Sequence, residues 1–328
     1  MTPPARFLPD VTPDAYRRPD GPPRLSQSIA KLLCEASPWH AKQAIDRMAP
    51  PEEEADDEPT EPEREKKERD RGTIIHAYLL GTPAPFGVVR NLETGEPFRD
   101  FRTKAAKEQK AATLAAGKIP MIASKADAIL RQGERIRQHL YHEHGIDLTG
   151  RSELAVEWNE RATNGDLVPC RGMLDHWILE QRIIYDLKIW RSANPVNLPR
   201  QIKDNGLDIQ AEAYTRAVEQ VHPELAGRVR FIALVCEAHS GLTVPIELDG
   251  TTKQLGRMRW RRAIDLWARC TAADDWPGYA RGVLTVGVGE YQLAAEMARA
   301  SDDNRDDELE SINEMVRREH DNRKRATA

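Results

Sequence analysis

Three short segments rich in β-branched and apolar residues follow one another in the middle of the chain. They are SELAVEW (152–158), VPCRGMLDHWIL (168–179) and RIIYDLKIW (182–190), and turn residues separate them. Runs of this length and composition predict β-strands, and short connections between strands predict antiparallel pairing. The middle of the chain is therefore expected to form a three-stranded antiparallel meander.

Helical patterns lie on both sides of this meander. Helices are expected at 25–48, 72–81, 104–116, 121–144, 207–220, 251–274 and within 289–300, while 82–103 is expected to be a loop. Pro38 should divide the first helical segment in two. Two further strands are expected at 228–238 and 242–248. This order predicts an α/β (α+β) domain with a central mixed sheet flanked by helices.

Three segments lack the pattern of a packed core. Residues 1–24 are rich in proline and are expected to form an irregular N-terminal arm. Residues 50–71 are highly charged and nearly free of apolar side chains, which predicts a disordered acidic insertion, because little burial can offset the entropy of ordering. Residues 301–328 form a charged C-terminal tail, expected to be helical or frayed. The folded domain is then 25–300.

The charge of the chain neither supports nor excludes a nucleic-acid ligand. The net charge is −5, but residues 51–71 contribute −6 and residues 301–328 contribute −3, which leaves +4 for the rest. A mildly basic body can hold a phosphate backbone if its basic residues line one groove.

Composition excludes several other classes of protein. The four cysteines include no CxxC pair, which argues against a zinc ribbon or an iron–sulfur cluster. No apolar run approaches the roughly 20 residues of a membrane helix, and the N-terminus has no signal-peptide pattern. A cytoplasmic location without a membrane partner is therefore expected.

The segment YDLK (185–188) holds a charged pair at the end of an apolar strand. Residues two apart on a strand project to the same face, so Asp186 and Lys188 should lie together while Leu187 faces the other way. Burying such a pair is costly unless it serves a purpose. Taken alone, however, the pair is more typical of a surface ion pair.

Two other short patterns give this pair a context. Asp175, which follows Gly172, could meet Asp186 across a hairpin, although it could also cap a turn. Converging carboxylates repel unless a cation lies between them, and Mg²⁺ or Mn²⁺ suits such oxygen ligands. Gln210 and Tyr214 share one helical face and can hydrogen-bond a phosphate, or they can be a solvated Gln and a half-buried Tyr.

In this order and spacing, the G-x-x-D, D-x-K and Q-x-x-x-Y patterns resemble the PD-(D/E)XK nuclease superfamily, in the branch with the RecB-type nuclease domains. Four further segments are similar to the exonuclease VIII (RecE) C-terminal nuclease domain group. They are Ser26-Gln27-Ser28, GTIIH (72–76), DFRTKAAKEQKAA (100–112) and E-x-x-x-x-W (153–158). The matches span about residues 25–280. The resemblance implies a restriction-endonuclease-like core for the mixed sheet.

The resemblance also implies roles for individual residues. The metal ligands would be His76, Asp175, Asp186 and the Leu187 carbonyl, with Mg²⁺ as the cofactor and Mn²⁺ as its substitute. Lys188 would orient or activate the attacking water, and Gln210 and Tyr214 would steady Lys188 and the scissile phosphate. Glu153 is the candidate for an additional acid, with Glu157 as its rival. A single His in an apolar helix is more often a core residue, but the position of His76 shortly after Gly72 favours the ligand.

The activity implied by the resemblance is that of a DNA exonuclease acting on linear duplex ends in phage or prophage recombination or repair. It further implies 5′-to-3′ polarity, a homo-oligomer and a single-strand annealing partner of the RecT kind. Two alternatives stay open: an endonuclease or nickase with the same core, and a catalytically silent DNA-binding module. The Asp175, Asp186 and Lys188 set argues against the silent module, which would not need it.

Overall fold

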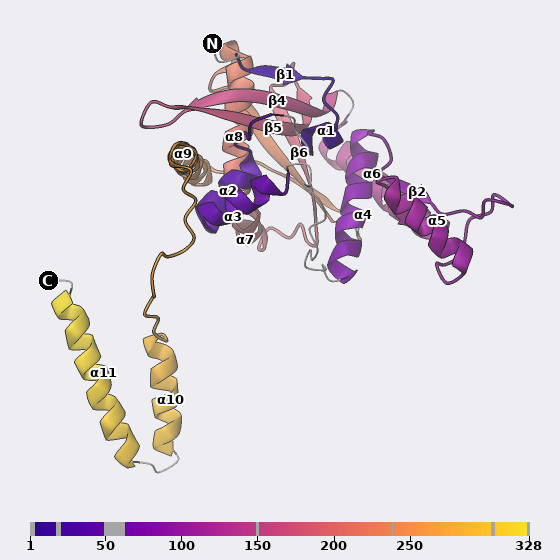
Figure 1. Ribbon diagram of the computed structural model, residues 1–328. Coiled ribbons are helices and arrows are strands. Elements are labelled where there is room, and N and C mark those ends of the chain that lie inside the picture. The colour runs from indigo at the N-terminus through magenta and orange to yellow at the C-terminus, as the bar shows by residue number, and fades with distance from the viewer. Residues whose placement is uncertain are drawn as a thin grey trace. The chain divides into compact units, whose positions relative to one another are not determined.

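The computed structural model describes residues 4–17, 21–48, 63–148, 151–237, 239–302 and 306–326. The chain divides into two units, Met1–Tyr279 and Ala280–Ala328. The first unit contains a six-stranded mixed sheet flanked by helices (Figure 1). This confirms the mixed α/β fold expected from the sequence. No helix in the described part of the chain is long and apolar enough to span a membrane.

The sheet has the strand order β1-β4-β5-β6-β7-β8. Its strands are β1 (Arg6–Leu8), β4 (Arg151–Arg161), β5 (Leu167–Ile178), β6 (Ile183–Trp190), β7 (Arg230–Glu237) and β8 (Thr243–Ile246). The central strands β4, β5 and β6 pair antiparallel, as predicted. β7 lies parallel to β6, because helices α7 (Leu198–Asn205) and α8 (Leu207–Val221) carry the chain back across the sheet between them.

Apolar side chains cover both faces of this sheet. On one face, Ile184 packs in a cluster with residues of α2 (Gln27–Glu35), α8 and α9 (Gly250–Ala273). On the other face, Leu187 packs with residues of α4 (Glu63–Leu80) and α6 (Ala123–His144). Side chains alternate along β6, so Asp186 occupies a position facing the first cluster where an apolar residue would be expected.

The helices largely follow the predicted pattern. Ser26 accepts a hydrogen bond from the Ile29 amide at the start of α2, and Pro38 begins α3 (Pro38–Asp46). The remaining helices of the first unit include α1 (Pro13–Arg17) and α5 (Lys104–Ala115). The segment expected to be a loop at 82–103 contains β2 (Phe86–Val88), which pairs parallel with β3 (Ile119–Met121). Three-residue strands are too short to show a periodicity in sequence.

The structure differs from the sequence predictions for three segments, namely the N-terminal arm, the acidic insertion and the C-terminal tail. The arm contains β1 and α1, and β1 is ordered by pairing with the edge of β4. Of the expected insertion, 63–71 form the first half of α4, since a packed helix extends at little cost once nucleated; residues 50–62 lie outside the described residues. The second unit begins at Ala280 rather than 301, and holds α10 (Glu290–Asp302) and α11 (Asp306–Ala326).

Replacing Gly256 in α9 by alanine should destabilise the first unit. A Cβ atom there would collide with the Asp208 carbonyl oxygen and lie 2.8 Å from its carbon, where α8 crosses α9. Overpacking against backbone predicts a loss of about 1–3 kcal/mol in the free energy of unfolding, measured by urea denaturation. Gly250→Ala in the same helix is the control, because its Cβ meets nothing within 4 Å. Equal losses in both variants would contradict this explanation.

Candidate active site

The candidate site lies where two neighbouring strands separate. β5 and β6 pair only at His176↔Tyr185, Trp177↔Ile184 and Ile178↔Ile183. The next step of this ladder would set Asp175 opposite Asp186, but there the pairing ends. Beyond that point β5 remains paired with β4, and β6 remains paired with β7. The two carboxylates therefore lie at a strand fork, defined here as the Asp175 and Asp186 positions of β5 and β6.

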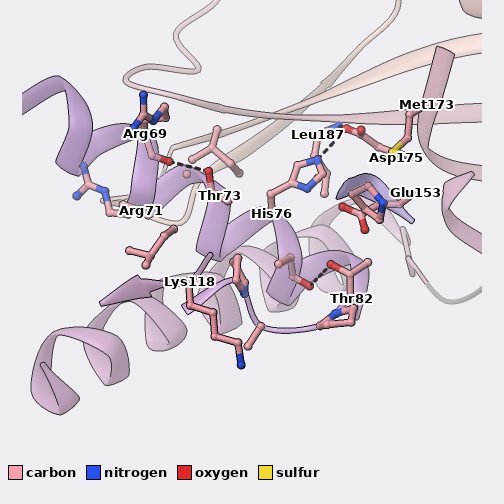
Figure 2. A pocket seen from close by; sticks show the side chains of 18 of the residues that line it. Arg69, Arg71, Thr73, His76, Thr82, Lys118, Glu153, Met173, Asp175 and Leu187 are labelled. Carbon is pink, nitrogen blue, oxygen red and sulfur yellow. Dashed lines mark hydrogen bonds and ion pairs between the residues drawn. The ribbon is translucent and has the colours of Figure 1, made fainter. Parts of the chain in front are cut away.

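Asp175 connects the two sides of the strand fork. Its Oδ2 accepts a hydrogen bond of 2.8 Å from the Leu187 amide and lies 3.1 Å from Nε2 of His76 on α4 (Figure 2). The carboxylate thereby replaces the strand partner that the Leu187 amide loses when the ladder ends. His76 projects from α4 toward the strand fork, as expected for a residue of the site rather than of the core.

Glu153 lies on β4, directly across from Asp175 on the neighbouring strand β5. The flanking pairs Ser152↔His176 and Leu154↔Leu174 share one register, and that register sets Glu153 across from Asp175. Glu153 has φ +50°, a conformation that costs a residue with a side chain about 1–3 kcal/mol and often marks functional sites. Acidic side chains directly opposite each other on paired strands are also destabilising. Both features make Glu153 a candidate member of the site.

Glu157, the rival of Glu153, is placed elsewhere. Its carboxylate lies 3.5 Å from Arg6 and 3.3 Å from Arg24, at the edge of the sheet covered by β1. It therefore serves as an ion-pair partner of the arm, and the geometry favours Glu153.

Asp186 and Lys188 project to the same side of β6, as their spacing predicts. Asp186 is completely buried, and its two oxygens have different neighbours. Lys188 Nζ lies 2.5 Å from Oδ2, and Gln210 Nε2 of α8 donates to Oδ1 over 2.6 Å. Gln210 thus acts on Asp186 rather than on Lys188.

Tyr214 packs behind the strand fork. A Cβ atom at Gly172 would lie 2.8 Å from Cε1 of its ring, so this glycine is needed for the close approach of α8 to β5. Burial raises the pKa of the Tyr214 hydroxyl well above its ordinary value, which keeps the group neutral. Tyr214 is therefore a buried packing residue between α8 and β5 in this structure.

A partly buried ion pair holds α8 in this position. Arg216 donates two hydrogen bonds, of 2.6 and 2.5 Å, to Glu160 of β4, which is buried. The indole nitrogen of Trp158 also donates to Glu160, over 3.1 Å. The sequence analysis did not identify this pair, although Glu160 stands two residues after an inward-facing tryptophan on the same strand face.

The charges at the strand fork influence one another strongly. Burial raises the pKa of Asp186 to about 6; Lys188 opposes this shift and Asp175 adds to it. Burial would also raise the pKa of Asp175, but His76 and Lys188 outweigh it and hold that pKa below its ordinary value. For His76, burial is outweighed mainly by Asp175, so its pKa is raised. Two carboxylates held this close favour a bound cation.

The donor chemistry fits a divalent metal ion. Carboxylates of Glu153, Asp175 and Asp186 and the Leu187 carbonyl are hard oxygen donors of the kind that Mg²⁺ and Mn²⁺ prefer. Across the described ranges, no three His, Cys, Asp or Glu side chains stand close enough to form a complete cage. Mg²⁺ commonly keeps several water ligands, so a partial set of protein donors suits it.

The Asp175 side of the strand fork lines a cleft with a volume of ≈ 1280 Å³. Figure 2 shows Glu153, Asp175 and His76 gathered at one side of this cleft, with Arg69, Arg71 and Lys118 at the other. We call the basic side chains that line the cleft the cationic rim; its members are Arg69, Arg71, Lys118 and Arg191. An acidic floor beside a basic rim suits a polyanion whose charge is neutralised at one point by metal.

The N-terminal arm also lines this cleft, which its sequence did not predict. Thr12, Pro13 and Tyr16 line it. Arg171 of β5 fixes them by donating a 2.9 Å hydrogen bond to the Tyr16 carbonyl, with its guanidinium 4.7 Å from the Tyr16 ring centre. A buried arginine on a central strand needs a partner, and this need was the one sequence signal available.

Known proteins similar to this chain are few and distant among those compared. No protein-family model matches the chain. No curated protein matches it either. Among solved structures, the chain is similar to a "Putative exonuclease" from Eubacterium rectale, with 12% sequence identity and a TM-score of 0.49 over 87% of this chain and 97% of that one. At this level of likeness the match does not bear on the chemistry of the strand fork.

Adding Mg²⁺ should stabilise the protein through the strand fork. At an Mg²⁺ concentration ten times its Kd, the free energy of unfolding should rise by about 1.4 kcal/mol, seen as a higher Tm by calorimetry. Asp175→Asn, which removes one donor charge, should abolish most of this rise. Asp46→Asn in α3, where an exposed carboxylate pairs with Lys42, should leave it intact. An equal rise in all three proteins would place Mg²⁺ elsewhere.

Proposed function

We propose that this chain is a Mg²⁺-dependent DNA exonuclease that hydrolyses phosphodiester bonds of linear duplex DNA. The observation that carries the proposal is the strand fork, where β5–β6 pairing ends, the Asp175 charge acts on Asp186, and Lys188 lies beside Asp186. A fully buried carboxylate next to a partly buried one, with an adjacent ammonium group, is costly to a structure that does not use it. A catalytically silent DNA-binding module would have no need for that arrangement.

Asp175, Asp186 and the Leu187 carbonyl would hold the metal, and Glu153 would be the additional acid beside it. A bound Mg²⁺ supplies a water of lowered pKa and neutralises charge on the phosphate in the transition state. His76, which contacts Asp175 Oδ2, would either join the ligands or orient Asp175.

The chain's own side chains would perform the remaining tasks. Lys188 presents an ammonium group beside the strand fork, where it can donate a hydrogen bond to the attacking water or to a phosphate oxygen. Gln210 holds Asp186 from the opposite side and so fixes the direction of its free lone pairs. Tyr214 and the Glu160–Arg216 pair keep α8 close enough for Gln210 to reach.

The cationic rim supports a polynucleotide as the substrate class. A DNA strand with one phosphate at the strand fork would carry neighbouring phosphates toward these basic side chains, where each contact adds attraction that salt weakens. Resemblance of the sequence motifs supports the finer proposals of 5′-to-3′ polarity, a role in phage-type recombination and a single-strand annealing partner.

Purified protein incubated with Mg²⁺ and either linear or closed circular duplex DNA tests this function. We expect the linear DNA to be degraded and the circles to persist. Asp186→Ala should lower the rate by about 1000-fold or more, because it removes a metal ligand and leaves Lys188 unpaired. Asp46→Ala is the matched control and should act like the unaltered protein.

Other outcomes would select the alternatives. Cutting of circles would identify an endonuclease or nickase. Absence of Mg²⁺-dependent degradation of either DNA would refute the nuclease proposal, and tight DNA binding under the same conditions would then favour a silent binding module.

Reversing a charge on the cationic rim should weaken substrate binding without altering the chemical step. For Lys118→Glu we expect KM for linear DNA to rise about tenfold at low salt with kcat nearly unchanged, and log KM to depend less steeply on log salt. Lys42→Glu, an exposed position of α3 that does not line the cleft, controls for net charge. A fall in kcat alone would show that Lys118 does not act through binding.

A further inference from the structure

The second unit exposes an unusual amount of apolar surface. Large apolar side chains stand exposed along it, namely Val283, Leu284, Val286, Val288, Tyr291, Met315 and Val316. Among its described side chains, none is buried, and Leu293, Met297 and Ile312 are covered only in part. Exposed apolar side chains in such number mark a surface that another molecule covers.

The helices of this unit are too small to be stable by their own packing. α10 has 13 residues and α11 has 21, and the two contact each other. Isolated helices shorter than about 12–15 residues are marginal in water, and helices in proteins owe most of their stability to a packed face. Units of this size usually need a metal, disulfides or association to reach a stable fold. A partner surface would supply the missing burial.

The charges of α11 are arranged in two halves of opposite sign. Residues 306–316 contain five acids and no base, whereas residues 317–326 contain five bases and two acids. The exposed apolar residues Met315 and Val316 stand at the middle of the helix, between the two halves. Such a helix is complementary to a copy of itself that runs in the opposite direction.

We propose that α11 pairs antiparallel with α11 of a second copy of this chain, with both α10 helices packed alongside to complete a four-helix bundle. In a two-fold arrangement each acidic half faces the partner's basic half, and Met315 and Val316 meet their counterparts at the axis. The helix dipole alone favours acids at the start and bases at the end of a lone helix. It does not account for the exposed apolar residues between them.

The ion pairs already present in α11 do not oppose this association. Arg318 donates to Glu314 of the same helix over 3.4 Å, with both side chains more than two-thirds exposed. An exposed pair of this spacing contributes about 0.3–0.5 kcal/mol. Exchanging it for a pair across the interface therefore costs little.

Sedimentation equilibrium of the full chain tests the proposal without any measurement of nuclease activity. We expect a dimer, with twice the 37.1 kDa mass of one chain, that weakens as salt is raised. Val316→Glu should raise the dissociation constant by about 30-fold or more, since it sets two like charges at the axis. Leu92→Glu makes the same change at an exposed leucine of the first unit and should have no effect.

Charge reversal then tests the antiparallel direction. Replacing Asp306, Asp307, Glu308, Glu310 and Glu314 by lysine makes both halves of α11 basic. Arg317→Glu with Arg318→Glu and Arg323→Glu makes both halves acidic. Each variant alone should be monomeric, and an equimolar mixture should form a heterodimer. A monomeric unaltered chain, or an assembly that survives Val316→Glu or either charge reversal, would overturn the proposal.

Discussion

The buried Asp186 carboxylate constrains the positions of the groups around it. It occupies a core position on β6, and it is held there by the Lys188 ammonium group on one oxygen and the Gln210 amide on the other. Both partners must be in place at once, because a buried charge that loses a partner is strongly destabilising. The position of α8 is therefore fixed by Asp186 as well as by apolar packing. The Glu160–Arg216 pair and the contact of Tyr214 with Gly172 maintain that position at two further points.

One side of the strand fork, at Asp175, is exposed to the cleft. Asp175 and Glu153 face the cleft, while Asp186 and Lys188 face the core, and the two sets meet only because β5 and β6 separate there. A continuous ladder would keep the two faces of the sheet apart. The end of pairing is thus what allows carboxylates from opposite faces to approach one point, and the Leu187 amide marks it by bonding Asp175 instead of a strand.

Local periodicity predicted much of this arrangement. The alternation along β6 is sufficient to orient Asp186 and Lys188 together, and the helical spacing of Gln210 and Tyr214 is sufficient to put them on one face. Contacts between distant segments could not be predicted in the same way. The positive φ of Glu153, the contact between Arg171 and Tyr16, and the pairing of β1 depend on which strands become neighbours. The start of α4 at Glu63 depends on packing further along the helix, which a count of charged residues does not reveal.

The short ladder between β5 and β6 has a consequence for how the sheet opens locally. In the described part of the chain, three residue pairs join β1, β4 and β5 to β6, β7 and β8 by strand hydrogen bonds. The sheet therefore consists of two halves joined by these three pairs. Asp175 and Asp186 lie at the end where the pairing stops. Opening of the last pair would change the spacing of the two carboxylates, while the apolar cluster that packs against both halves of the sheet would stay intact. The spacing of Asp175 and Asp186 would then report local opening before any spectroscopic signal of global unfolding.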